Sequence, residues 1–279
     1  MCSSDLRPGA PGRPHLENIG LMWAPLILIA AAGAALFMDN LSGVRSSFVD
    51  QISVVKRKHT WVISVLYIAT FGSFVGYSAA FPMLLKTQFP EVTANLVFLG
   101  AMVGSLVRPL GGLLSDKIGG SRVTLWTFVA MPLAVLGALY FLGEHSFPGF
   151  LGAFLLLFIT AGIGNGSTFR MIPAIFRAER LQEAAAAGAG LDEAARDLAL
   201  RAARRDSAAV IGFSSAIGAL GGYFIPRAFG ASIRSTGGPG IAFGWFIAYY
   251  VACAGMTWWY YRRRSFMTRT VPSLASANT

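Results

Sequence analysis

The stretch that decides the fold runs from Gly100 to Arg122, GAMVGSLVRPLGGLLSDKIGGSR, because it places an arginine inside a segment otherwise suited to a membrane. Residues 95–115 are almost all apolar or small, and these 21 residues come close to the roughly 20 that a helix needs to cross a bilayer. Arg108 lies eight residues before Asp116, about 12 Å below the polar end of such a helix. A guanidinium at that depth costs at least about 2.5 kcal/mol, so we expect it to face a cavity or a partner.

The composition is that of an all-α protein with several membrane spans. Of the 279 residues, 54% are hydrophobic and only 13% are charged. The net charge of +10 would suit nucleic acid, but the basic residues cluster between apolar runs, so we expect no nucleic-acid partner. Cys2 and Cys253 lie in a polar tail and an apolar run, and the three histidines lie in tails or loops. We therefore predict no disulfide, metal site or cofactor.

Seven apolar runs of spanning length predict seven transmembrane helices, at residues 21–38, 61–85, 95–115, 124–142, 150–176, 207–226 and 241–261. Residues 1–20 are interpreted as a disordered or non-native lead-in and 265–279 as a tail. The loop 177–206 is rich in Ala, Leu, Glu and Arg, which predicts a short solvated helix. A surface linker and a regulatory partner site are both compatible with it.

Basic residues are distributed unequally between the two sets of loops. The segments 39–60, 115–123, 177–206 and 262–279 carry sixteen Lys and Arg residues, whereas the opposite loops carry only Lys86, Arg227 and Arg234. Cytoplasmic loops are enriched in Lys and Arg, so the first set, and with it the C-terminus, is predicted to be cytoplasmic.

Arg108 is the first candidate for a binding role. Its planar fork of donors matches a planar oxyanion such as nitrate or a carboxylate, and lysine lacks that bidentate geometry. A structural ion pair or a gate-lining arginine is the alternative. No Asp or Glu lies within the seven runs, which weakens the ion-pair interpretation. Arg170, nearer the end of its run, fits snorkelling and a cavity role equally well.

Other polar and aromatic side chains at membrane depth are further candidates. Tyr67 and Phe71 are four residues apart and share a helix face, so their rings could wall a slot for a flat anion or simply pack against neighbours. Asn165 is a polar group in the fifth run and could line the same pathway. In the sixth run, Ser214 and Ser215 could touch a substrate.

Small residues dominate three runs and predict close helix packing. Three GxxxG pairs are present, Gly100 with Gly104, Gly162 with Gly166, and Gly218 with Gly222. In the sixth run, tight and movable packing is expected at Gly212, Gly218, Gly221 and Gly222.

Residues 112–122, GLLSDKIGGSR, resemble the loop motif of major facilitator superfamily transporters. The resemblance implies that Gly112, Asp116, Lys117 and Arg122 belong to a motif that connects cytoplasmic helix ends. Combined with LYIATFGSFVGYSAAFPMLLKTQFP, TAGIGNGSTFRMIPAIF and GFSSAIGALGGYFIP, it makes residues 21–264 similar to the bacterial nitrate/nitrite porters.

The resemblance implies a site and a mechanism. Arg108 would bind nitrate or nitrite opposite a second arginine of another helix, with Tyr67 and Phe71 around the anion and Ser215 as the substrate-side serine. Members of the family have twelve helices in two halves with the substrate between them. The seven spans would be the last helix of the first half and the whole second half. We therefore expect an amino-terminally truncated porter of the bacterial inner membrane that works by alternating access and is inactive without the missing amino-terminal half.

Two alternatives stay open, a transporter of another small anion such as a short carboxylate, and a half-transporter or scaffold that needs a second chain. An enzyme is not expected, because no His, Asp or Glu lies in a span to serve as a base or metal ligand. The same lack of a carboxylate favours nitrate/nitrite exchange over proton symport.

Overall fold

The structure, a computed structural model, describes residues 16–38, 53–92, 96–186 and 193–263. Every regular element in these ranges is helical, which confirms the predicted all-α class. The chain divides into two units, residues 1–46 and 47–279. The first contains α1, Leu16–Phe37, which begins inside the segment interpreted as a lead-in. Most of that lead-in and the tail 265–279 lie outside the described residues.

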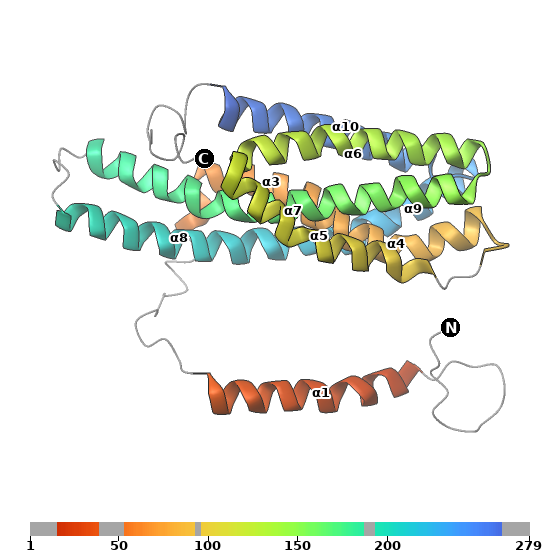
Figure 1. Cartoon of the computed structure of the whole chain (residues 1–279), viewed down its shortest axis with the longest axis horizontal. Helices are drawn as coiled ribbons and strands as arrows, with labels where there is room; N and C mark the ends of the chain where they lie inside the picture. Colours follow the sequence, from red (N-terminus) through yellow and green to blue (C-terminus); the bar gives the residue numbers. More distant parts are fainter. Residues whose placement is uncertain (1–15, 39–52, 93–95, 187–192, 264–279) are drawn as a thin grey trace. The chain divides into compact units, whose positions relative to one another are not determined.

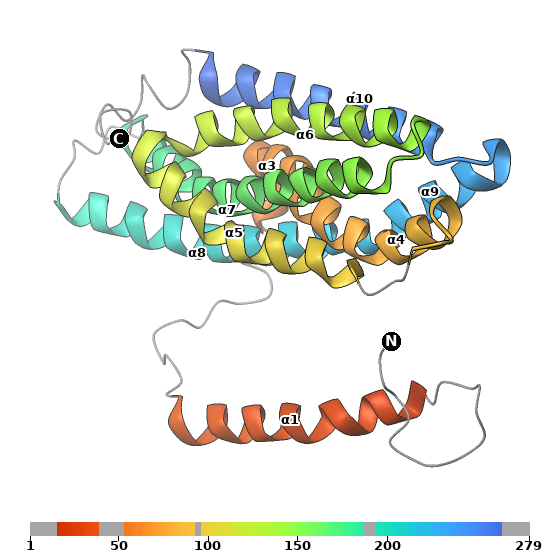
Figure 2. The ribbon, with the colours of Figure 1, turned by 45° about the vertical axis from the view of Figure 1, so that its right-hand side comes forward.

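The second unit is a bundle of helices (Figure 1 and Figure 2). Its elements in chain order are η1 (Val54–Lys56), α3 (Lys58–Tyr67), η2 (Ile68–Gly72), α4 (Ser73–Gln88), α5 (Val97–Ile118), α6 (Gly120–Gly143), α7 (Phe147–Ala186), α8 (Glu193–Ala219), α9 (Gly221–Thr236), α10 (Gly240–Thr257) and η4 (Trp258–Arg262). Within the described residues, six helical stretches are long and apolar enough to cross a membrane, and Trp23–Phe37 is a shorter apolar helix. The chain is therefore a multi-pass membrane protein, as predicted.

Two of these stretches are built from more than one element. The helices α3 and α4 form a single rod through η2, a π-helical turn in which the Ser73 N–H donates to the Ile68 carbonyl. The helices α8 and α9 form a second rod that is interrupted only at Leu220. A π turn inside an α-helix often marks a functional position, and η2 carries Phe71.

Helix ends differ from the predicted boundaries in two places. The sixth span was expected to end at Pro226, but α9 continues to Thr236, where Gly237 in the left-handed conformation ends the helix (φ 76°). The segment 177–206 does not form a separate short helix. Residues 177–186 continue α7 and residues 193–206 begin α8, so that both helices extend beyond their apolar parts at one end of the bundle (Figure 1).

The core surrounds α7, which packs against α6, α5 and α8. Aromatic rings fill the middle of the bundle, with the rings of Phe81 and Phe154 stacked at 4.7 Å between centroids. Most polar groups in the core are paired, as where the Tyr250 hydroxyl hydrogen-bonds those of Ser73 (2.7 Å) and Tyr77 (2.6 Å). The interior is thus closely packed and largely satisfied.

Glycines set the closest helix contacts. In the α5–α7 seam, a Cβ on Gly162 would meet the Gly104 carbonyl, and one on Gly166 would meet the Arg108 carbonyl. In the seam that α4 and the last residue of η2 form with α9 (the α4–α9 seam), a Cβ on Gly221 would lie 2.5 Å from the Gly72 Cα. Both seams therefore need glycine for the backbones to approach.

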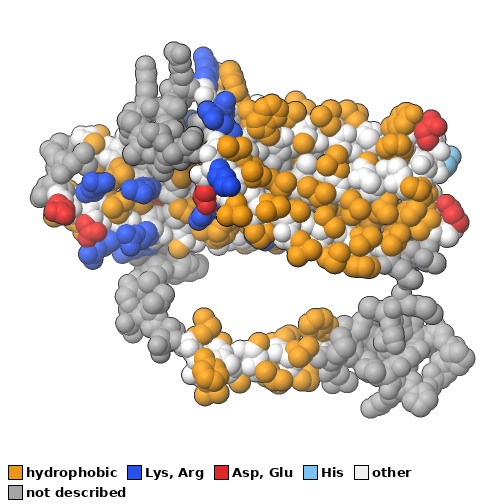
Figure 3. Space-filling view, viewed as in Figure 1, with side chains coloured by type: hydrophobic (Ala, Val, Ile, Leu, Met, Phe, Trp, Pro, Cys, Tyr) orange, Lys and Arg blue, Asp and Glu red, His pale blue; other side chains and the backbone are white. Residues whose placement is uncertain are grey.

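The outer surface of the bundle is apolar over its middle and basic at one end (Figure 3). Large apolar side chains are exposed along the spans, including Trp126, Leu133 and Trp245. The basic side chains gather at the end where α7 and α8 extend (Figure 3). An apolar belt with one basic end is the pattern expected of a protein in a bilayer.

Candidate functional site

A small pocket of about 150 Å³ lies between α4, α5 and α7, at the position of Arg108. Its lining residues are Phe74, Gly104, Ser105, Arg108, Gly162 and Asn165. The pocket exists because the Gly104–Gly162 contact brings the α5 and α7 backbones together without filling the space beside it. Arg108 is half-buried there.

The Arg108 guanidinium has an aromatic neighbour but no acidic one. Its central carbon lies 5.8 Å from the centre of the Phe71 ring, within reach of a cation–π interaction. Among the described residues, no carboxylate pairs with it, so its positive charge is not neutralised by the bundle itself. A half-buried cation of this kind is stabilised by a bound anion.

The side-chain amide of Asn165 is the second polar group in this pocket, after the Arg108 guanidinium, that lacks a partner. The side chain is 1% exposed, and neither Nδ2 nor Oδ1 has a hydrogen-bond partner among the described residues. A buried amide without partners costs about 1–3 kcal/mol. Because Asn165 lines the same pocket as Arg108, a ligand held there can supply the missing hydrogen bonds.

Tyr67 and Phe71 lie beside one another rather than on opposite sides of a slot. Their ring centroids are 5.3 Å apart with an interplanar angle of 33°, so no anion fits between the two rings, and they pack against each other, the second of the two arrangements that the sequence left open. Tyr67 is buried (2% exposed), and Phe71 turns toward Arg108. A Cβ on Gly218 would lie 3.0 Å from Phe71 and 3.2 Å from Tyr67, so this glycine lets α8 approach both rings.

The two serines of α8 have different environments. The Ser214 hydroxyl is buried and hydrogen-bonds that of Ser64 at 2.8 Å. Ser215 is half-buried, and its hydroxyl makes no hydrogen bond within the described part of the chain. A Cβ on the neighbouring Gly212 would meet no described residue within 4 Å, so Gly212 packs against none of the described helices, in contrast to Gly218, Gly221 and Gly222.

The residues of the loop motif lie at the basic end of the bundle, away from the pocket. Arg170 Nη2 of α7 donates to Asp116 Oδ2 of α5 at 2.6 Å, with both side chains about half exposed. A Cβ on Gly112 would lie 3.8 Å from Arg170. Lys117 and Arg122 form no ion pair with any described residue. The ionic contact of the motif thus joins α5 to α7 through Arg170, for which the sequence left two roles open.

A cluster of ion pairs that the sequence did not reveal joins α7 and α8 to the start of α3. Asp206, which is 4% exposed, accepts from Arg180 Nε at 2.7 Å and lies 3.4 Å from Arg57 Nε. Arg57 also pairs with Glu179 (3.0 Å) and Glu183 (2.9 Å). Burial lowers the pKa of Arg57, but the hydrogen bond to Glu183 and the nearby carboxylates outweigh it and raise that pKa.

Several proteins of known name are similar in sequence to the chain, although no family model matches it. The chain is 46% identical over 257 residues to the nitrate/nitrite transporter NarU of Escherichia coli K12, covering 90% of this chain and 54% of that protein. NarU of Salmonella typhimurium LT2 is 47% identical over 255 residues, covering 89% and 54%.

A third relative is more distant. The probable nitrate/nitrite antiporter NarK2 of Thermus thermophilus is 30% identical over 266 residues, covering 92% of this chain and 54% of that protein. The chain thus spans about half the length of the curated relatives it matches.

Proposed function

The chain belongs to the nitrate/nitrite porter family of the major facilitator superfamily, and from this premise we propose that it forms the anion-binding half of a nitrate/nitrite transporter. The transporter lies in a bacterial inner membrane and works by alternating access. The basic end of the bundle, and with it the C-terminus, faces the cytoplasm. The unequal distribution of Lys and Arg supports this orientation.

The Arg108 pocket is the observation that carries the proposal. Arg108 offers a planar fork of donors, and Asn165 offers an amide without a partner in the same pocket. The Phe71 ring lies against the guanidinium and limits how it turns. A volume of about 150 Å³ suits a small anion and excludes bulky ones.

The remaining candidate residues have supporting roles in this proposal. Tyr67 holds the Phe71 ring in place, and Ser215 donates to the anion from α8. Gly218 allows the backbone of α8 to pack closely against both rings. The pair of Asp116 and Arg170 stabilises one arrangement of the cytoplasmic helix ends, within the motif that includes Gly112, Lys117 and Arg122.

A second half of similar size completes the transporter in this proposal. The chain spans about half of its relatives, and binding sites of such transporters lie between two halves. We therefore assign the chain no transport by itself. We assign it no enzymatic activity either, because its relatives are transporters. No carboxylate lines the Arg108 pocket within the described residues, which favours exchange of nitrate for nitrite over proton symport.

Exchange in proteoliposomes tests the proposal. Vesicles loaded with nitrite are prepared with this chain alone, or with the chain co-expressed with the amino-terminal half of a nitrate porter. Addition of external nitrate is expected to release nitrite only where both halves are present. Release by the chain alone would contradict the need for a second half. If formate or acetate abolishes the release of nitrite that nitrate causes, this would favour a short-carboxylate transporter instead.

A further inference from the structure

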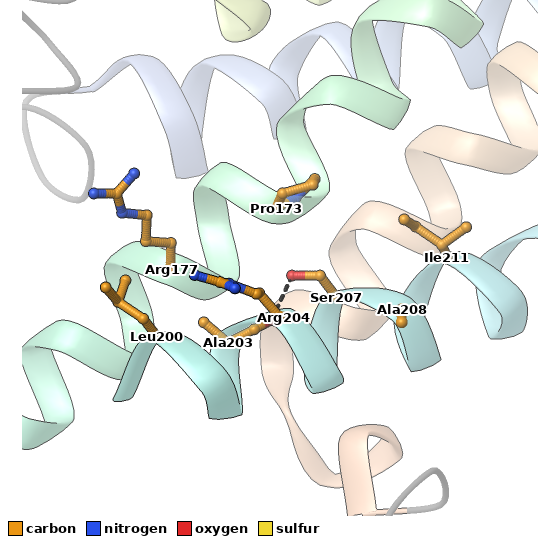
Figure 4. Close-up of a pocket in the computed structure, with 8 residues that line it drawn as sticks. All are labelled: Pro173, Arg177, Leu200, Ala203, Arg204, Ser207, Ala208 and Ile211. Carbon is orange, nitrogen blue, oxygen red and sulfur yellow. Dashed lines mark hydrogen bonds between the residues drawn. The ribbon is translucent and has the colours of Figure 1, made fainter. Parts of the chain in front are cut away.

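A second hollow lies between α7 and α8, close to the basic end of the bundle (Figure 4). Its volume is about 510 Å³. Most of its lining is apolar, with Pro173 contributed by α7 and Leu200, Ala208 and Ile211 by α8. Arg177 of α7 and Arg204 of α8 also line it, and Figure 4 shows both side chains at the same end of the groove.

The two arginines differ from Arg57, Arg180 and Arg201 in having no acidic partner within the described residues. Arg57 and Arg180 are held by Asp206 and nearby glutamates, and Arg201 pairs with Asp197 at 2.8 Å. Within the described residues, neither Arg177 nor Arg204 forms an ion pair. The Ser207 hydroxyl in the groove is already used, since it donates to the Ala203 carbonyl at 2.6 Å (Figure 4). The polar side chains of the groove that have no partner within the described residues are therefore the two cationic ones.

The groove lies on the same face of α8 as Ser215. Ile211, Ala208 and Arg204 precede Ser215 by four, seven and eleven residues, and a helix of 3.6 residues per turn places all three within about 40° of it. Arg204 is thus about 16 Å along the helix from Ser215, toward the basic end. An anion leaving the Ser215 region along this face would pass the groove.

We propose that the groove is a second anion site, in which Arg177 and Arg204 hold a small inorganic oxyanion on its way to or from Arg108. That the anion is nitrate or nitrite rests on the function proposed above. Apolar walls around like charges concentrate the electrostatic potential and raise the local concentration of anions. Because both arginines are exposed, the site binds weakly and releases its anion readily, as a station on a pathway requires.

A cysteine placed in the groove measures this potential without relying on transport. Ala208 is exposed and lines the groove, so Ala208→Cys is made in a Cys2→Ser background, where Cys253 is fully buried. The purified full chain in detergent is treated with an anionic or a cationic methanethiosulfonate reagent. The arginines can also change the fraction of the cysteine that is thiolate, but this changes the rates of both reagents by the same factor. The ratio of the two rates is therefore independent of it.

The anionic reagent is expected to react about tenfold faster than the cationic one, relative to the same ratio for a free thiol. Arg177→Gln with Arg204→Gln should abolish this preference. Arg201→Gln, which removes a nearby arginine that is already paired, should leave it unchanged. Equal thermal midpoints of the variants show that folding is preserved. A preference that survives the double substitution overturns the proposal.

Protection by sodium nitrate then identifies the occupant. Nitrate is expected to slow the anionic reagent more than sodium chloride of equal ionic strength, and to lose this effect in the double variant. Protection by phosphatidylglycerol but not by nitrate would assign the groove to a lipid headgroup. Equal protection by both salts would mean screening alone. Either result overturns the proposal, while the function proposed for Arg108 is tested separately by Arg108→Lys.

Discussion

Arg108 combines depth, charge and shape at a single position. Its guanidinium is half-buried beside Phe71 and has no carboxylate partner among the described residues. If only a positive charge were needed, lysine would supply it equally well, as a point charge on a flexible side chain. The fork of donors is the property that distinguishes a site for a planar oxyanion.

Replacing Arg108 by lysine therefore separates charge from geometry. In a transporter with both halves present, Arg108→Lys should leave the thermal midpoint nearly unchanged and raise the Kd for nitrate at least about tenfold, or about 1.4 kcal/mol. Isothermal titration with nitrate measures the change. Arg170→Lys is the matched control, since Arg170 pairs with Asp116 at an exposed position. An unchanged Kd for Arg108→Lys would remove Arg108 from the proposed site.

Asn165 gives a prediction in which stability and binding move in opposite directions. Both polar atoms of the amide are buried without partners, which costs about 1–3 kcal/mol in the absence of a ligand. Asn165→Ala removes this cost and introduces the best helix former, so the thermal midpoint should rise while nitrate binding weakens. Detergent thermal unfolding and nitrate titration measure the two effects.

A control for Asn165 is available on the same helix. Thr160 uses its hydroxyl within α7, where it donates to the carbonyls of Leu156 and Leu157 at 3.0 Å. Thr160→Val should therefore leave nitrate binding unchanged. A fall in the thermal midpoint of Asn165→Ala together with unaltered binding would mean that the amide has a structural role only.

At the scale of the helices, two glycine seams fix where the side chains of the candidate site lie. The α5–α7 seam holds Arg108 and Asn165 on facing helices, and the α4–α9 seam includes Gly72, the last residue of the π turn that carries Phe71. Backbone contacts backbone in both seams, so a steric clash introduced there cannot be relieved by rotating a side chain.

The α4–α9 seam can be tested with a matched pair of substitutions. Gly221→Ala would place a Cβ 2.5 Å from the Gly72 Cα and should destabilise the bundle by about 1–3 kcal/mol. Gly212→Ala lies in α8 with nothing within 4 Å and should stabilise it by up to about 1 kcal/mol. Unfolding of the detergent-solubilised chain distinguishes them. Equal effects of the two substitutions would contradict a role for close backbone contact.

The elements themselves were largely predictable, because a run of about 20 apolar residues is a local property of the sequence. Their ends were not. Pro226 was expected to end a helix that continues to Thr236, and charged residues after Phe176 continue α7 to Ala186. Neither end is marked by hydrophobicity, since helix formers extend a helix into water as readily as apolar residues extend it through a membrane.

The site was predictable only where a single residue carries the signal. Arg108 and Asn165 stand out as polar groups at membrane depth, whereas Phe74 and Ser105 line the pocket only through tertiary packing. The partner of Asp116 lies 54 residues away on another helix and left no pattern in the sequence. Contacts of this kind depend on how helices pack, which periodicity does not record.

At the scale of the whole molecule, the basic end defines an orientation that labelling can check. Glu144 is exposed at the end of α6, and Leu198 is exposed (68%) on the extended part of α8 at the opposite, basic end. A membrane-impermeant maleimide should label Glu144→Cys in spheroplasts and Leu198→Cys in inverted vesicles, because basic segments remain cytoplasmic. The reverse pattern would contradict the proposed orientation.

The π turn at Ile68–Gly72 determines how the chain tolerates the loss of a single residue. A π turn holds one residue more than an α turn, because its hydrogen bonds join residues five apart rather than four. One deletion here can therefore be taken up by closing the turn to α geometry. The same deletion in the regular part of the rod between this turn and Tyr77 would rotate the Tyr77 side chain by about 100° away from the Tyr250 hydroxyl. In the descent of such a chain, the π turn is the point at which the length of the rod can change by one residue while its rotational register is kept.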